Sequence, residues 1–184
     1  MNKYHKTFIN SFASENIIAL FSRYKNAHKE ITESMAMLEA AKRFIPNVSE
    51  CLVVVVGDGA SPRTGAVFAY FTKAEVISVD PAFNMAHWEV HYRQQAAMGF
   101  PIQRLEVIKD KIEDVPIYCK DKRVLILWPH SHADMDSIKL FDYGQRYDIA
   151  MPCCRQIPSN WASLPHIYYE DKNILSPKRS IHIW

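Results

Sequence analysis

The sequence predicts an α/β protein built on an open, mostly parallel sheet, with helices on both faces and a C-terminal antiparallel hairpin or edge strand. The apolar run Leu52–Val56 stops at a glycine pair, which is typical of a buried parallel strand entering a turn. A second β-branched run, Glu75–Val79, ends on Asp80. Strand-like and helix-like segments then alternate along the chain, which favours right-handed parallel connections.

The composition is that of an ordinary folded domain. The chain has 184 residues, of which 48% are hydrophobic and 23% charged. We expect a single domain over 1–184, with N-terminal helices over 1–46 and the sheet core over 50–184. The formal net charge of +2 creates no overall field that would recruit nucleic acid. Four cysteines without a C-x-x-C spacing favour a reduced, cytoplasmic setting, and no apolar stretch approaches the roughly 20 residues of a membrane span.

Two amphipathic helices are predicted before the first strand, after a loose arm over residues 1–10. In the first helix, apolar residues recur at helical spacing from Ser14 to about His28, with Ser14 as the N-cap. The second runs from about Lys29 to Phe44 and is ended by Pro46. We expect both helices to cover one face or edge of the sheet. They also offer a surface for a protein partner.

The segment from Gly57 to Asp80 has the layout of a nucleoside-cofactor site: a glycine turn, a helix over 64–71, a strand and an acid. Glycine lets the backbone approach a ligand because it has no Cβ. Asp80 follows Gly59 by 21 residues and can accept hydrogen bonds from ribose hydroxyls. The next glycine is Gly65, so the spacing departs from the G-x-G-x-x-G of dinucleotide-binding proteins, and the longer loop suits a cofactor without pyrophosphate. A parallel-sheet protein with a glycine turn and a capping Asp80 stays open as the alternative.

The remaining elements are expected in order after Asp80. They are a helix over 82–99, strands over 102–108 and 124–128, a short helix over 135–143, a strand over 147–151, and two β-like runs over 166–169 and 180–184. The last two runs can pair as an antiparallel hairpin on the sheet edge.

With VVVVGDG as a first motif and VISVDP as a second, the chain resembles the Rossmann-like class I S-adenosylmethionine-dependent methyltransferases. The resemblance implies S-adenosylmethionine as the cofactor. It implies that Gly57, Asp58 and Gly59 face the methionine and ribose, with Thr64 in the same set and Asp80 on the ribose. In the related enzymes an acid at the end of the third strand meets the adenine amino group, and Asp110 stands there, unless it is a solvated charge.

The end of the fourth strand is where the resemblance places the chemistry, and the sequence departs from the family there. Neither the Asp/Asn-Pro-Pro-aromatic motif nor the Lys-Asp-Lys-Glu set is present. The chain has His130, His132 and Asp134 instead. A histidine oriented by a carboxylate can take a proton from a nucleophile, so His130 with Asp134 is the candidate catalytic pair. The same cluster could ligate a metal, although we expect none, or form a polar loop that caps the next helix through Asp134 or Ser131.

Three further residues are candidates for substrate contacts. Arg63 follows Pro62 in the glycine loop, where it can bind the cofactor carboxylate or a substrate phosphate, or face solvent. Cys153 and Arg155 follow the fifth strand. A thiol beside a single arginine stays mostly protonated, so Cys153 and Cys154 are as well explained by packing or by a wall of the substrate site as by covalent catalysis.

The leading hypothesis is an S-adenosylmethionine-binding methyltransferase. A nucleic acid, RNA included, or a nucleotide is the acceptor implied by the family's habits and by the basic clusters over 120–123 and 178–179. The first alternative is a protein that keeps the fold as a binding or scaffolding module without catalysis, because both usual catalytic sets are missing. The second is an NAD(P)-binding oxidoreductase, against which the glycine spacing counts.

Overall fold

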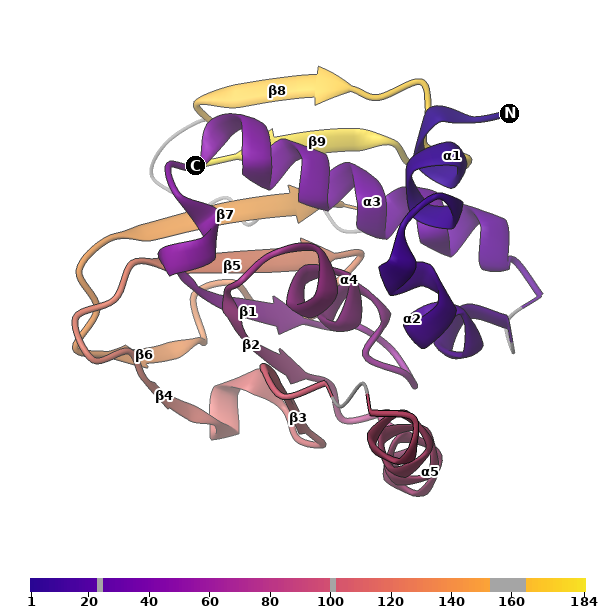
Figure 1. The fold of residues 1–184 in the computed structure, drawn as a ribbon. Helices are drawn as coiled ribbons and strands as arrows, with labels where there is room; N and C mark the ends of the chain where they lie inside the picture. Colours follow the sequence, from indigo (N-terminus) through magenta and orange to yellow (C-terminus); the bar gives the residue numbers. More distant parts are fainter. Residues whose placement is uncertain (23–24, 100–101, 153–164) are drawn as a thin grey trace.

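This computed structural model describes residues 1–22, 25–99, 102–152 and 165–184. A seven-stranded sheet with the order β3-β2-β1-β5-β7-β9-β8 forms its centre (Figure 1). Its strands are β1 (Leu52–Val56), β2 (Glu75–Val79), β3 (Leu105–Ile108), β5 (Val124–Pro129), β7 (Arg146–Met151), β8 (Ile167–Glu170) and β9 (Ser180–Ile183). The first five in this spatial order are parallel, and β9 and β8 join antiparallel at one edge. The predicted fold class, an α/β protein with a mostly parallel sheet and a C-terminal antiparallel hairpin, is confirmed. The helices expected on both faces instead cover mainly one of them.

The central strand β1 explains why its sequence is a continuous apolar run. All five of its residues are buried, because both faces of the sheet are covered there. Val53 and Val55 belong to the core under the helices. Leu52, Val54 and Val56 point to the opposite face and belong to a second core cluster.

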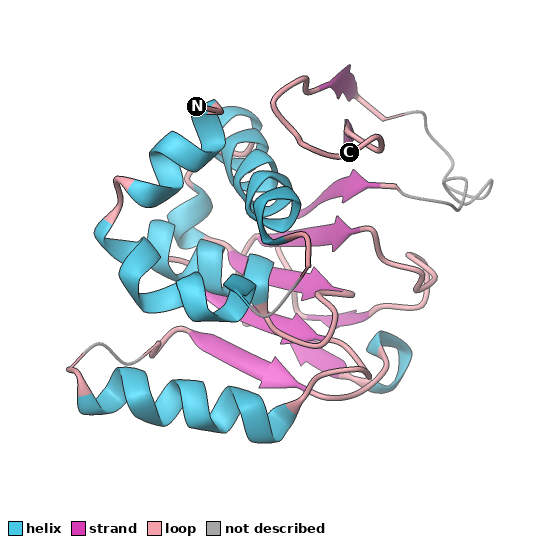
Figure 2. Cartoon of the chain, turned by 90° about the vertical axis from the view of Figure 1, so that its right-hand side faces the viewer, coloured by secondary structure: helices cyan, strands magenta, loops and turns pink. Residues whose placement is uncertain are grey.

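The helices α1 (Lys3–Ile9), α2 (Phe12–Ser22), α3 (Ala27–Phe44) and α4 (Arg63–Phe71) contribute buried residues to the first of these cores. Figure 2 shows the helices gathered on one side of the strands, with a short helical turn on the other, while α5 (Met85–Ala97) lies at the β3 end of the molecule. The two predicted N-terminal helices correspond to α2 and α3 with shifted bounds.

The loose arm predicted over residues 1–10 is wrong, because α1 occupies most of it. The side chain of Asn2 accepts a hydrogen bond from the backbone N–H of Tyr4 and so caps the helix. Tyr4 and Phe8 lie one helical turn apart and are both buried. A seven-residue helix is unstable alone, so tertiary packing of these two rings is what holds it.

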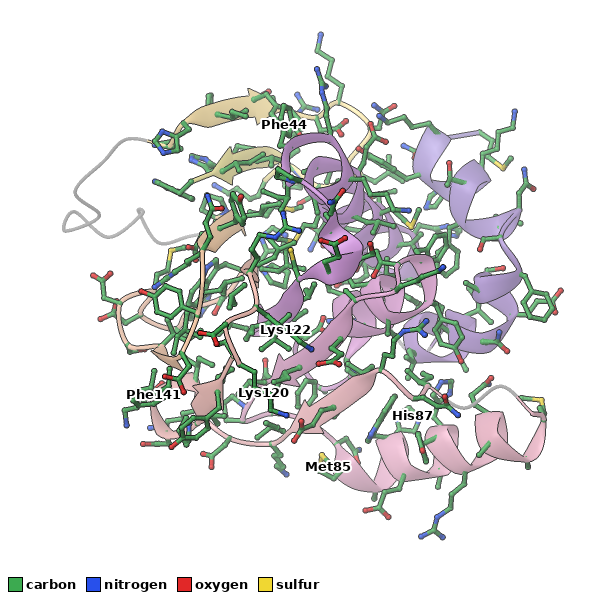
Figure 3. The ribbon with its side chains drawn as sticks, turned by 60° about the vertical axis from the view of Figure 1, so that its left-hand side comes forward. Phe44, Met85, His87, Lys120, Lys122 and Phe141 are labelled. Atoms are coloured by element: carbon green, nitrogen blue, oxygen red, sulfur yellow. The ribbon has the colours of Figure 1, made fainter. Side chains whose placement is uncertain are left out.

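The second face of the sheet is covered by the 3₁₀ turn η2 (Ile112–Asp114) and a two-stranded parallel sheet of β4 (Pro116–Tyr118) and β6 (Lys139–Phe141). The helix predicted over 135–143 is therefore wrong. The backbone N–H of Cys119 donates to the carbonyl of Phe141 over 2.8 Å, which extends the pairing beyond β4. Figure 3 shows Phe141 near Lys120 and Lys122 on this side of the molecule. Pairing of β6 with β4, which lies far from it in the sequence, outweighed the helical pattern of residues 135–143.

The β8–β9 hairpin and its connection pack against the N-terminal helices. Phe44 lies at the end of α3 (Figure 3). Its ring lies 6.1 Å from that of Tyr169 in β8. In the connection, Asp171 accepts a hydrogen bond from the Tyr4 hydroxyl. The backbone N–H of Leu175 donates to the Thr32 hydroxyl over 3.0 Å. The two ends of the chain are thus joined through α1 and α3.

Candidate functional site

A cleft of about 400 Å³ lies at the carboxyl ends of the parallel strands, where open α/β sheets bind ligands. Its wall is formed by the ends of β1 and β2, the turn η2 and the loop after β5. The lining residues are Val56, Gly57, Val79, Asp80, Pro81, Lys111, Ile112, Glu113, His130, Ser131, His132 and Ala133. The structure therefore brings Gly57, Asp80 and His130 together, three of the residues that the sequence singled out.

Gly57 ends β1 in a conformation that other residues rarely adopt. Its φ is +83°, and a Cβ at this position would lie 2.8 Å from Ser131 Oγ and 3.0 Å from Ser131 Cα. The loop after β5 thus packs directly on the glycine turn. Gly57 is required here by both its backbone angle and this close approach.

Asp80 links the two strand ends that flank the cleft. One carboxylate oxygen accepts a hydrogen bond from the backbone N–H of Gly59 over 2.7 Å, and the other accepts from Ala82 N–H over 2.6 Å. The residue is 7% exposed. A carboxylate oxygen can accept more than one hydrogen bond, so each retains capacity toward a ligand.

Asp58 is buried next to Gly57 and is not part of the cleft lining. Its carboxylate accepts hydrogen bonds from the backbone N–H groups of Thr64 and Gly65, each over 2.9 Å, and from the Ser78 hydroxyl over 3.0 Å. Burial raises the pKa of Asp58 above its ordinary value, against the opposing effect of these hydrogen bonds and of the Arg63 charge. The position of Asp58 is that of a cap on the N-terminus of α4.

Arg63 and Thr64 join the glycine loop to α3. An Arg63 guanidinium nitrogen lies 3.2 Å from the Glu30 carboxylate, and another donates to the backbone carbonyl of Asp58 over 3.1 Å. The Thr64 hydroxyl lies 3.1 Å from that of Ser34. Both side chains are therefore engaged between the first loop and α3, outside the residues that line the cleft.

His130 is paired with Glu33, a residue that the sequence did not single out. The Nε2 atom of His130 lies 2.7 Å from Glu33 Oε1. Glu33 is 3% exposed, and Lys29 Nζ lies 3.4 Å from the same oxygen. Burial acts to raise the pKa of Glu33, but the hydrogen bond and charge of His130, the charge of Lys29 and the Ser176 hydroxyl together lower it below the ordinary value.

Asp134 accepts hydrogen bonds from the residues that follow it in its own loop. Its carboxylate accepts from the backbone N–H of Asp136 over 3.1 Å, and its carbonyl accepts from the Ser137 hydroxyl over 2.6 Å. A carboxylate oxygen of Glu33 lies 2.7 Å from His130 Nε2, and His132 lies in the cleft lining.

The other predicted site residues are placed as follows. Asp110 is exposed, its carboxylate accepts from the Lys111 N–H over 2.8 Å, and it is absent from the cleft lining. Cys153 and Arg155 lie outside the described residues.

In the part of the chain that the structure describes, no three His, Cys, Asp or Glu side chains are grouped to hold a metal ion. Over the same ranges, no helix is long and apolar enough to cross a bilayer.

No family model matches the sequence, and a comparison with curated proteins finds no match. A comparison with solved structures finds 61 matching chains. A mutant of MtNAS in complex with S-adenosylmethionine matches with a TM-score of 0.54 and 9% identity, over 98% of this chain and 69% of the other.

Two further matches have lower TM-scores. Geranyl diphosphate methyltransferase in complex with S-adenosylmethionine matches at 0.42 with 12% identity over 72% of this chain, which spans 58% of that protein's length. Putative methyltransferase yhhF from Escherichia coli matches at 0.46 with 12% identity, over 80% of this chain and 81% of the other. At these identities the similarity concerns the fold. The chain has the Rossmann-like fold of the class I S-adenosylmethionine-dependent methyltransferases.

Proposed function

We propose that the protein binds S-adenosylmethionine in the cleft at the carboxyl ends of β1, β2 and β5 and transfers its methyl group to an acceptor. The observation that carries this proposal is the meeting of the Gly57 turn and the Asp80 carboxylate in one cleft of about 400 Å³. The fold, shared with MtNAS in its complex with S-adenosylmethionine, supports it. In this proposal Asp80 binds the ribose, and the Gly57 backbone faces the cofactor.

The N-terminus of α4 supports this cofactor over a dinucleotide. A pyrophosphate is normally bound by the free backbone N–H groups at the start of such a helix. Here the N–H groups of Thr64 and Gly65 donate to Asp58, and that of Arg63 donates to the Ser61 carbonyl. A built-in carboxylate thus occupies the position of the phosphate. S-adenosylmethionine has no phosphate and does not need these donors.

The acceptor is a separate part of the proposal. The basic residues that favoured a nucleic acid or nucleotide are largely engaged in ion pairs. Lys122 lies 2.6 Å from the Glu75 carboxylate, and Arg123 lies 2.7 Å from that of Glu50. Support for a nucleic-acid acceptor therefore comes from the family resemblance alone, and an acceptor screen should include small molecules.

Calorimetric titration with S-adenosylmethionine and S-adenosylhomocysteine tests the cofactor assignment. Wild-type protein is compared with Asp80→Ala and with Asp110→Ala, an exposed acid outside the cleft lining. We expect Asp80→Ala to bind more than tenfold more weakly, because the ribose hydroxyls lose a charged acceptor. Asp110→Ala should bind like the wild type.

Two controls make the result specific. Asp80 also holds the N–H groups of Gly59 and Ala82, so Asp80→Asn and a circular dichroism spectrum separate lost binding from lost structure. A parallel titration with reduced nicotinamide dinucleotide tests the oxidoreductase alternative. If the wild type binds neither adenosyl ligand, the cofactor proposal is wrong and a non-catalytic binding module becomes the better description.

A further inference from the structure

We propose that the protein has a second ligand site, for a small organic phosphate, at the edge of the sheet opposite the cofactor cleft. A cavity of about 720 Å³ lies there, within the size range of small-molecule sites. Its lining comes from the end of α3, the turn before β1, the end of α4 and the residues just before β2 and β3. Because these three strands are parallel, the cavity lies where they begin, whereas the cleft lies where they end.

The lining of this cavity is positively charged. It contains the exposed side chains of Lys42, Lys73 and Arg104 and, among the described residues, no carboxylate. Two acids close to the lining in the sequence, Glu50 and Glu75, are ion-paired with other cations, over 2.7 and 2.6 Å. Over the described ranges, none of the three cations of the cavity has an ion-pair partner. Their charge is therefore available to a ligand.

The ends of α3 and α4 offset only part of this charge. Both helices end at the cavity, and the C-terminus of a helix carries about half a negative charge. The two helix ends therefore offset about one of the three positive charges, which leaves about two. A phosphate monoester carries a charge of about −1.5 to −2 at pH 7, so it matches this excess.

Arg104 is held in place for a contact with phosphate. Its Nη2 atom donates to the carbonyls of Ala69 and Thr72 at the end of α4, over 3.3 and 3.4 Å. In the part of the chain that the structure describes, Nε and Nη1 make no hydrogen bond of their own. A guanidinium binds phosphate oxygens through paired N–H donors, whereas a lysine acts as a point charge. The fixed guanidinium and the two lysines thus provide both kinds of contact.

An apolar part of the lining adjoins the cations. Ile45 and Val48 are buried, and the Phe71 side chain is half-buried. The Nζ atom of Lys42 lies 6.0 Å from the centre of the Phe71 ring. An inorganic ion would leave this apolar surface in contact with water. The ligand that fits has a phosphate group for the cations and an apolar part for Ile45 and Phe71.

Calorimetric titration with phenyl phosphate and with inorganic phosphate tests the site. The wild type is compared with Lys42→Gln, Lys73→Gln, the double variant and Lys139→Gln, a control at an exposed lysine of β6 outside the cavity. We expect phenyl phosphate to bind more tightly than inorganic phosphate, because its ring covers apolar surface. Each cavity variant should weaken binding of phenyl phosphate about three- to fivefold, the effect of one exposed charge pair. The double variant should weaken it about tenfold or more, and Lys139→Gln should bind like the wild type.

Several results would overturn the inference. It is wrong if the wild type binds neither probe, or if Lys139→Gln weakens binding as much as the cavity variants do. Tighter binding of a short single-stranded oligonucleotide through the same two lysines would overturn the small-molecule class in favour of a nucleic-acid backbone. Circular dichroism spectra of the variants separate lost binding from lost structure. These titrations contain no cofactor, so their result does not depend on whether the protein binds S-adenosylmethionine.

Discussion

Replacing Gly57 by alanine is expected to destabilise the protein far more than the same replacement at Gly99. The two glycines have nearly the same φ, +83° and +82°. A Cβ on Gly57 would lie 2.9 Å from Ser131 Cβ and 3.0 Å from Ser131 Cα, whereas a Cβ on Gly99 would meet nothing within 4 Å. Gly99→Ala is therefore a matched control, which carries the backbone cost without the collision.

The size of the difference follows from these distances. The left-handed backbone costs alanine about 1 kcal/mol at either position. Carbon atoms prefer separations of about 3.5–4.0 Å, so at Gly57 the loop that carries Ser131 must also shift by several tenths of an ångström. Overpacking of this kind costs about 1–3 kcal/mol. We expect losses of about 2–4 kcal/mol for Gly57→Ala and about 1 kcal/mol for Gly99→Ala.

Urea unfolding followed by tryptophan fluorescence measures both values. Ser131→Gly, added to Gly57→Ala, removes the collision with Cβ but keeps that with Cα, so it should restore only part of the loss. Equal losses of unfolding free energy for the two alanine variants would refute the reasoning. They would show that the close approach of the loop after β5 to Gly57 adds no cost to the backbone strain.

Two further variants test other parts of the structure. Asp58→Asn should lower the free energy of unfolding in urea by about 1–3 kcal/mol, because its amide nitrogen would face one of the buried N–H donors at the start of α4. Asp110→Asn, at an exposed position, should lower it little. Equal losses for the two variants would contradict the capping role of Asp58. Burial, with a smaller contribution from His87, lowers the pKa of His91 below its ordinary value of 6.5, so the unfolded chain takes up this proton first. Stability should fall as the pH drops below about 6.5, and His91→Phe should flatten that fall in thermal unfolding between pH 8 and 5. An unchanged slope would show that His91 does not carry the effect.

The fold was predictable where the local pattern and the tertiary structure agree. The bounds of β1 and β2 were predicted correctly, because each is a short β-branched run ended by a turn residue. The segment over 135–143 failed because β6 is defined by its pairing with β4, more than 20 residues earlier. Local periodicity contains no information on such a partner.

The candidate site was predictable at the strand ends and not beyond them. Gly57, Asp80 and His130 follow strands whose carboxyl ends meet in any open parallel sheet. Asp58 follows Gly57 after β1, but its carboxylate caps the N-terminus of α4 instead of lining the cleft. The conformation of the loop determines this, and the sequence pattern does not show it. Glu33 gave no signal, because it lies on the side of α3 away from the apolar stripe of Ile31, Met35 and Leu38. It is buried by the end of β5 and by the connection that contains Ser176.

The contacts between the two ends of the chain set an order for folding during synthesis. The partners Tyr4 and Asp171 are 167 positions apart, and Thr32 and Leu175 are 143 apart. The central parallel strands can pair while the chain is still emerging from the ribosome, whereas α1 and the start of α3 gain these partners only after residue 175 has been made. The first helix can pack its Phe8 ring on Phe21 and Phe71 earlier. Its hydrogen bond to Asp171, and that of Thr32 to Leu175, form only in a late step, and contacts of such long sequence separation make that step slow.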